Sequence, residues 1–167
     1  GDKSDGNIGT SHWNSDSELY ILGKADSDTD EYDTHIIVHE WGHYFGAKLG
    51  RSDSIGGSHG TGDVLDPRVA FAEGWGNALS AMMLYPNVTY FDTSGTRQQS
   101  GWSMNLESGS NENPGWFSET SVELILFDLF DSDSDTNDTV SLGIGPIYDV
   151  MVGEQKTTSS FTTLFSF

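Results

Sequence analysis

Apolar residues recur at helical spacing over residues 31–49, and three polar side chains lie among them. The stripe that would face inward consists of Tyr32, Ile36, Ile37, His39, Glu40, His43, Tyr44 and Ala47. Asp30 or Asp33 can cap the start of this helix, and Gly50 suits the position after its last turn. Histidine and glutamate side chains on a buried face need polar partners, so the pattern predicts a helix that binds something.

A second helix is predicted over residues 67–84. Asp66 is a favourable N-cap, Pro67 fits the first helical position, and Pro86 follows the last turn. Glu73 is the only acidic residue in this largely apolar stretch. A lone carboxylate in such a helix either extends to water or binds a partner, and we expect the second.

The remaining sequence predicts shorter elements. They are a strand at residues 19–22, a long loop region at 86–116 that has room for a hairpin, a buried helix at 121–130 begun by a Thr120/Glu123 capping box, and short helices at 146–152 and from residue 159 onward. Together these elements predict an α+β fold that is mostly helical, with a small strand element near the N-terminus. Residues 1–167 are expected to form a single domain.

The most specific motif is HExxH, formed by His39-Glu40-Trp41-Gly42-His43. Residues four apart share one face of a helix, so the two imidazoles can bind one metal ion. Glu40 then lies close enough to act as a base on water at that ion. The alternative is a surface helix that carries two histidines by accident.

A catalytic zinc ion usually takes three protein ligands, so the motif needs a third. Leu49 occupies the position of the third histidine in the pattern HExxHxxGxxH, and leucine cannot bind a metal. Glu73 is therefore the candidate, and Gly74 and Gly76 beside it would allow the two helices to approach closely. Asn77, one turn further on, is expected to hydrogen-bond the outer nitrogen of a zinc-bound histidine; the alternative is an ordinary hydrogen bond within the helix.

HExxH followed by a glutamate on the next helix resembles the gluzincin class of zinc peptidases, which includes the thermolysin and fungalysin families. The segment Ala72–Ala78, AEGWGNA, is similar to the GEGWxD glutamate helix of fungalysins. The resemblance covers residues 30–84. It implies a zincin-like metallopeptidase core in which His39, His43 and Glu73 bind zinc and Glu40 is the general base.

The resemblance carries further expectations about the chain. In zincins a strand beside the active-site helix pairs with the substrate backbone, and residues 19–22 are well placed for that role. Asn77 stands where both families have aspartate, and a glycine-rich insert at 51–65 lengthens the spacing between the two motifs. The chain ends in the apolar, uncapped stretch 161–167, so we expect a catalytic core that is a fragment of a longer protein.

Peptide hydrolysis also needs a hydrogen-bond donor for the oxyanion of the tetrahedral intermediate. Tyr148 and His59 are the two candidates, and the alternative for His59 is a polar loop residue. His35 lies one turn before His39 and is expected to be a buried structural residue.

The composition excludes several classes of partner. Twenty-six acidic residues against seven basic ones give a net charge of −19, which would repel nucleic acids and anionic membrane surfaces. No stretch of about 18 apolar residues is present, so membrane insertion is not expected. The acidity and the resemblance to a secreted class of enzyme predict a secreted, extracellular protein.

Two acidic runs have the alternating carboxylates of calcium loops. They are Asp26-Ser27-Asp28-Thr29-Asp30 and Asp131-Ser132-Asp133-Ser134-Asp135. Both lack the later glycine and glutamate of an EF-hand loop, so solvated loops are the alternative. Ca²⁺ is therefore a second candidate cofactor beside Zn²⁺.

The sequence as a whole predicts a zinc-dependent peptidase that acts on peptide or protein substrates. Two alternatives remain: a non-catalytic acidic secreted module with a calcium or vestigial zinc site, and a zinc hydrolase of non-peptide substrates. The presence of Glu40 favours an enzyme, because a site that had lost catalysis would have no need of a base.

Overall fold

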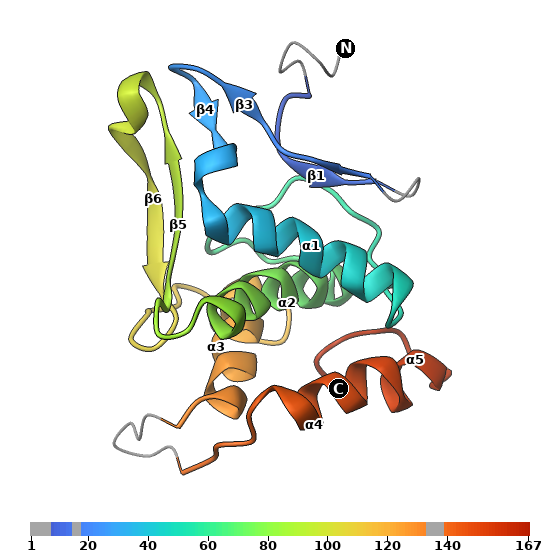
Figure 1. The fold of residues 1–167 in the computed structure, drawn as a ribbon. Coiled ribbons are helices and arrows are strands. Elements are labelled where there is room, and N and C mark those ends of the chain that lie inside the picture. The colour runs from blue at the N-terminus through green and yellow to red at the C-terminus, as the bar shows by residue number, and fades with distance from the viewer. Residues whose placement is uncertain (1–7, 15–17, 133–138) are drawn as a thin grey trace.

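Helices α1 (Thr34–Lys48) and α2 (Pro67–Leu84) pack against each other at the centre of an α+β fold (Figure 1). They are seen in a computed structural model of the chain, which describes residues 8–14, 18–132 and 139–167. The predicted bounds of α2 are confirmed. Its N-cap, Asp66, accepts a hydrogen bond from the backbone N–H of Arg68, as expected for an aspartate at that position.

The start of α1 differs from the prediction, because residues Asp30–Tyr32 form a separate 3-10 turn, η2. Asp33 holds the N-cap position but makes no capping hydrogen bond to the helix. Its carboxylate instead accepts hydrogen bonds from the backbone N–H and the hydroxyl of Thr93, at 2.6 and 2.8 Å. Because Thr93 belongs to strand β5 (Thr89–Ser94), the first turn of α1 is tied to a sheet rather than capped locally.

Glycines allow α1 and α2 to come close together, as predicted. A Cβ atom on Gly42 would lie 3.0 Å from the Cα of Gly76, and one on Gly76 would lie 2.7 Å from Nδ1 of His39. Gly74 faces the other neighbour of α2, since a Cβ atom there would lie 2.6 Å from the Cβ of Val122. The two glycines beside Glu73 therefore serve two different helix contacts.

Helix α3 (Glu119–Phe130) packs along α2 and buries Val122, Leu126 and Phe127 completely. The predicted Thr120/Glu123 capping box is wrong. The N-cap is Ser118, whose hydroxyl accepts from the backbone N–H of Ser121. Glu123 does not reach back to cap the helix but faces the interior, where it accepts a hydrogen bond from Asn77 and only 1% of its surface remains exposed.

The C-terminal part of the chain contains helices α4 (Ile144–Val152) and α5 (Glu154–Thr157). The short helix predicted at 146–152 is confirmed, but the helix predicted from residue 159 is absent: residues 159–167 form bends and turns. There the backbone carbonyls of Thr158 and Ser160 accept hydrogen bonds from the guanidinium group of Arg51. Long-range contacts thus replace the local hydrogen bonds that a helix would need.

Two small antiparallel sheets flank the helices. Strands β1 (His12–Trp13) and β2 (Leu19–Tyr20) form one, and the second has the order β3-β4-β5-β6, with β3 at Gly23–Lys24, β4 at Asp28–Thr29 and β6 at Ser100–Asn105. The strand predicted at 19–22 is therefore shorter than expected, and a hairpin within 86–116 is confirmed as β5 and β6. This hairpin lies along one side of the helices (Figure 1).

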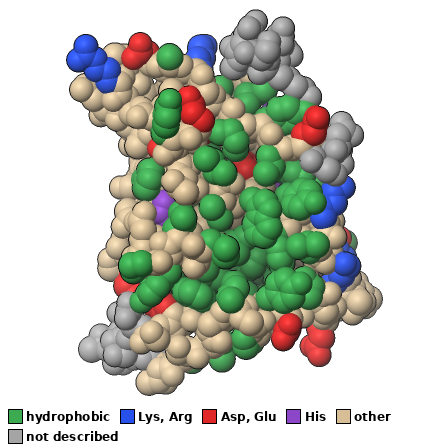
Figure 2. Space-filling model, viewed as in Figure 1, with side chains coloured by type: hydrophobic (Ala, Val, Ile, Leu, Met, Phe, Trp, Pro, Cys, Tyr) green, Lys and Arg blue, Asp and Glu red, His purple; other side chains and the backbone are tan. Residues whose placement is uncertain are grey.

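Hydrophobic side chains gather on one face of the molecule, over α1, α2 and α4 (Figure 2). Ile37, Trp41 and Tyr148 are among the large hydrophobic residues that stay exposed. In the part of the chain that the structure describes, no helix has both the length and the apolar character to cross a membrane.

We predict that Gly76→Ala destabilises the fold, although alanine is the better helix former. The added methyl group would overlap the His39 ring, and overpacking of this kind lowers the free energy of unfolding by roughly 1–3 kcal/mol. The matched control is Gly145→Ala on α4, where a Cβ atom meets nothing within 4 Å. Urea unfolding of both variants measures the difference, and equal stability of the two would show that the helices do not touch at Gly76.

Candidate metal centre

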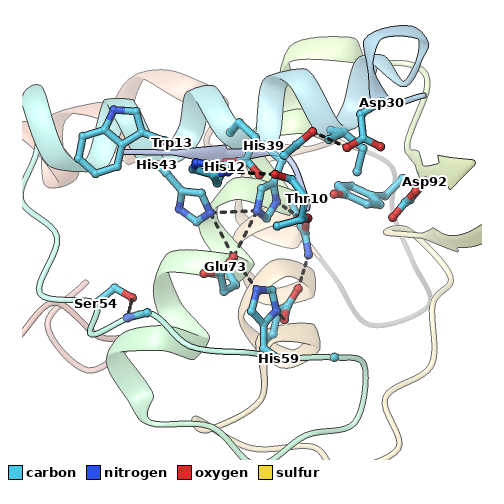
Figure 3. A pocket seen from close by; sticks show the side chains of 18 of the residues that line it. Thr10, His12, Trp13, Asp30, His39, His43, Ser54, His59, Glu73 and Asp92 are labelled. Atoms are coloured by element: carbon cyan, nitrogen blue, oxygen red, sulfur yellow. Dashed lines mark hydrogen bonds and ion pairs between the residues drawn. The ribbon is translucent and has the colours of Figure 1, made fainter. Parts of the chain in front are cut away.

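Three side chains from α1 and α2 converge on one point at the side of the helix pair (Figure 3). The Nε2 atoms of His39 and His43 lie 3.0 Å apart. Oε2 of Glu73 lies 3.2 Å from Nε2 of His39 and 3.1 Å from Nε2 of His43. The third group predicted from the sequence, Glu73, is therefore brought to the two histidines of the HExxH motif.

The separations of these atoms suit a shared metal ion. A tetrahedral ion with bonds of about 2.0–2.1 Å holds its ligand atoms about 3.3–3.4 Å from one another. The three observed distances are close to this value. Exposure is 7% for both His39 and Glu73, so this buried group could hold a metal ion.

Asn77 makes a hydrogen bond with the outer ring nitrogen of His39, as predicted. Its amide nitrogen donates hydrogen bonds to the carboxylates of Glu119 and Glu123, so its amide oxygen must face the histidine. That oxygen is 2.6 Å from Nδ1 of His39, which is therefore the donor. The neutral ring then has its proton on Nδ1 and its lone pair on Nε2, the atom that points to Glu73 and His43.

The residues behind Asn77 were missed in the sequence. Glu119 and Glu123 both come from the first turns of α3, and the capping-box interpretation gave Glu123 a local role. The one sequence feature that pointed to a shared role for Glu119 and Glu123 was their spacing of one helical turn beside an apolar run. It could not be interpreted without knowing that α3 packs on α2.

His59 also reaches the centre, although its loop has no regular structure. Its Nε2 lies 3.3 Å from Oε2 of Glu73, and its Nδ1 lies 2.9 Å from Oε2 of Glu119. The loop is held at both ends of the glycine-rich insert. At one end Arg51 donates a hydrogen bond to the carbonyl of Thr158 in the C-terminal segment, and at the other the backbone N–H of Leu65 donates to the carbonyl of Phe117. His59 is thus a site residue whose position depends on distant segments.

Charges in the centre shift the pKa values of its members. Burial lowers the pKa of His39, but the hydrogen bond with Glu73 and the carboxylates of Glu73, Glu40 and Glu119 outweigh it and raise that pKa to about 9. Burial opposes ionisation of Glu73, but the hydrogen bonds from the two histidines hold its pKa far below the ordinary value. The negative field that favours a proton on His39 equally favours a metal cation.

Two carboxylates near the centre differ in their surroundings. Burial, together with the charge of Glu119, raises the pKa of Glu123 to about 8. Glu40 is also buried, with 7% exposure, but it lines the open pocket next to His39 and His43. Within the described residues its carboxylate engages in no hydrogen bond or ion pair, so it is free to interact with a molecule in the pocket.

A pocket of about 780 Å³ opens onto the centre. Its walls include residues 10–13 around β1, the loop that carries His59, and Tyr90, Asp92 and Trp102 of the β5–β6 hairpin. The segment 19–22, predicted to lie beside a substrate, is not among the described residues that line the pocket. Its hairpin partner β1 takes that position instead.

The structure does not bring Tyr148 to the metal centre. This residue lies on α4, where its ring centroid is 5.9 Å from that of Phe45, and it is not among the described pocket residues.

His35 is buried, as predicted. Its Nδ1 lies 3.0 Å from the hydroxyl of Ser80, and burial lowers the pKa of His35 to about 4.

The two predicted calcium runs have different outcomes. In the first, Asp26 turns away and accepts a hydrogen bond from the backbone N–H of Arg97, while Asp28 and Asp30 face the pocket. In the second, Asp133 and Asp135 lie outside the described residues.

Comparison of the chain with protein-family models, curated proteins and solved structures gives no significant match.

We predict that Asn77→Ala weakens metal binding about 10–100-fold, because His39 loses the acceptor that holds its tautomer. Asn87→Ala is the control, since Asn87 is an exposed residue in the turn after α2. Competition with a chelator at one fixed pH measures both affinities, because protonation of the ligands also changes them. Equal affinities would mean that Asn77 makes only a structural hydrogen bond.

Proposed function

We propose that this chain is the catalytic core of a zinc-dependent peptidase of the gluzincin type. The observation that carries the proposal is the convergence of His39, His43 and Glu73, with Glu40 beside them at the floor of an open pocket. Three protein ligands with a fourth side left open distinguish catalytic zinc sites from structural ones. The order of motifs along the chain, HExxH and then a glutamate helix, agrees with the same class.

Two imidazoles and one carboxylate form a donor set that zinc accepts in hydrolytic sites. Zinc in such a site polarises a carbonyl group and makes water more acidic, to a pKa of about 7. The chain supplies the rest of the site: Asn77 sets the tautomer of His39, and the close α1–α2 contact holds Glu73 at the two histidines.

Glu40 is the proposed general base. Its position next to His39 and its unengaged carboxylate allow it to take a proton from the attacking water and pass it to the leaving amine. Ordinary structural carboxylates in a buried place are paired, so an unpaired one facing the pocket supports a catalytic role.

His59 is the proposed donor to the oxyanion, and it replaces Tyr148 as the better of the two candidates. Glu119 accepts a hydrogen bond from Nδ1, and this bond, against the opposing effect of burial, raises the pKa of His59 above its ordinary value. In the protonated ring Nε2 also carries a proton, and that atom faces the pocket beside Glu73. A cationic donor at this place can stabilise negative charge that develops on a substrate carbonyl oxygen.

The pocket suits an extended peptide substrate. Residues 10–13 line it along β1, a strand that pairs on one side with β2. A peptide backbone can add to the edge of such a strand and be held across the site. The net charge of −19 accords with the proposed secreted location and with a substrate that is a peptide or protein rather than a nucleic acid.

The test of this function is metal analysis together with Glu40→Gln. We expect one zinc ion per chain in both proteins, and loss of peptide hydrolysis by about 10²–10⁴-fold in the variant, because an amide cannot accept the proton. Glu154→Gln is the control, since Glu154 is exposed on α5. Chelation should abolish the activity of the parent and zinc should restore it. A parent that binds zinc but cleaves no peptide would instead support the non-catalytic module.

We predict that His59→Ala lowers kcat by roughly 10²–10³-fold, the effect expected from losing an oxyanion donor. Zinc content should stay at the level of the parent, because His59 is not one of the three convergent ligands. Tyr148→Phe should leave kcat unchanged, since this residue lies on α4 away from the pocket. Steady-state kinetics on one peptide compares the three proteins, and equal losses for both variants would contradict the assignment.

A further inference from the structure

Three aspartates meet on the pocket wall at a place separate from the His39 centre. They are Asp28 on β4, Asp30 in η2 and Asp92 on β5, and one carboxylate oxygen of each lies within 4.8 Å of the others. All three line the pocket, and Figure 3 shows Asp30 and Asp92 on the same side of it. The proposed peptidase mechanism uses none of them.

The carboxylates in this cluster lack the partners that buried acids require. Asp30 is only 4% exposed, and one of its oxygens, Oδ1, has no hydrogen-bond partner; the same holds for Oδ1 of Asp28. The other oxygen of Asp30 accepts a hydrogen bond from the hydroxyl of Ser11, and Asp28 and Asp30 can share one proton in a hydrogen bond between them. In the described part of the chain the ion pairs of arginine are made with Asp53 and Asp66, and no lysine or arginine pairs with the cluster.

Burial and mutual repulsion make these three acids costly to ionise. Burial is the main cause in each case and raises the pKa of all three, to about 6 for Asp30. A cluster of this kind is stabilised by a proton that its members share or by a cation bound among the three carboxylates. A cationic side chain of a substrate would be present only during turnover, so it could not stabilise the cluster in the free protein.

We propose that Asp28, Asp30 and Asp92 bind a calcium ion. Calcium takes carboxylate oxygens at about 2.3–2.6 Å, so oxygens that lie within 4.8 Å of one another can reach a single ion. The donors are all oxygen, which favours calcium over zinc, whereas the nitrogen-rich His39 centre favours zinc. The open side of the cluster faces the pocket, where water can complete the six to eight ligands that calcium takes.

The position of the cluster indicates what the ion would do. Asp30 lies four residues before the first turn of α1, and Asp92 lies next to Thr93, which binds Asp33. An ion shared by β4, η2 and β5 would fasten the β5–β6 hairpin to the start of the helix that carries His39 and Glu40. Calcium would thus stiffen the pocket wall and raise the stability of the whole fold.

Calcium titration of the protein that holds one equivalent of zinc tests the proposal, because the His39 centre is then already filled. We expect the melting temperature to rise with calcium concentration, with a dissociation constant of about 10⁻⁴–10⁻³ M, as for a site with few protein ligands. Asp92→Asn should weaken calcium binding by at least about tenfold, since the site loses one of its charged ligands. Asp28→Asn serves as the second variant should Asp92→Asn fail to fold.

The control is Asp149→Asn, which removes the same charge from an exposed position on α4 and should keep the full calcium response. Terbium(III) locates the site. Trp102 lies directly opposite Asp92 across the β5–β6 pair, so terbium emission excited through tryptophan should weaken in Trp102→Phe while calcium still raises the melting temperature.

Three outcomes would overturn the proposal. The first is a melting temperature of the parent that calcium does not change. The second is a calcium response that Asp92→Asn and Asp28→Asn both retain, which would place the ion elsewhere. The third is stabilisation by Asp30→Asn in a protein that shows no calcium response, which would mean that the carboxylates share a proton instead.

Discussion

Buried negative charge is the constraint on which this structure depends. The chain carries 26 acidic residues, and several of them are drawn into the interior around one pocket rather than left on the surface. A carboxylate in such a place is stable only with a cation, a proton or several hydrogen-bond donors. Glu73 obtains two histidines, Glu123 obtains the amide of Asn77, and the aspartates of β4, η2 and β5 have no comparable partner. The different solutions separate a buried His–Glu group that could hold a metal ion from a cluster of carboxylates with few partners.

Close packing of helices makes the first of these solutions possible. Gly42 and Gly76 remove the side chains that would otherwise separate α1 from α2, and the His39 ring occupies the space that a Cβ atom of Gly76 would take. The same contact places Asn77 behind His39, where α3 supplies the two carboxylates that fix its amide. The candidate ligands, the asparagine that contacts His39 and the two carboxylates that hold its amide therefore come from three consecutive helices, and a shift of any one helix would disturb the others.

Local patterns predicted α2 well and predicted other elements less well. Asp66 and Pro67 begin α2 by interactions within a few residues, so its bounds could be derived from the sequence alone. The Thr120/Glu123 capping box had equally good local chemistry, yet Ser118 took the cap and Glu123 was used by Asn77. The helix expected after residue 159 failed for a related reason, because Arg51 and Asp53 bind that segment from more than 100 residues away. In both places a long-range partner outcompeted a local one.

The sequence by itself identified His39, His43 and Glu73 as metal-binding candidates, Glu40 as the candidate base and Asn77 as the hydrogen-bond partner of a histidine. Helical spacing sets the faces of these residues, and an acid in an apolar helix needs a partner wherever the helix packs. Tertiary structure alone decided that His59 and not Tyr148 stands at the centre, and that Asp92 rather than Asp26 completes the aspartate cluster. His59 sits on a loop whose course depends on α3 and the C-terminal segment, and Asp92 reaches Asp28 through sheet pairing. Neither relation leaves a periodic trace in the sequence, because both depend on how separate segments pack together.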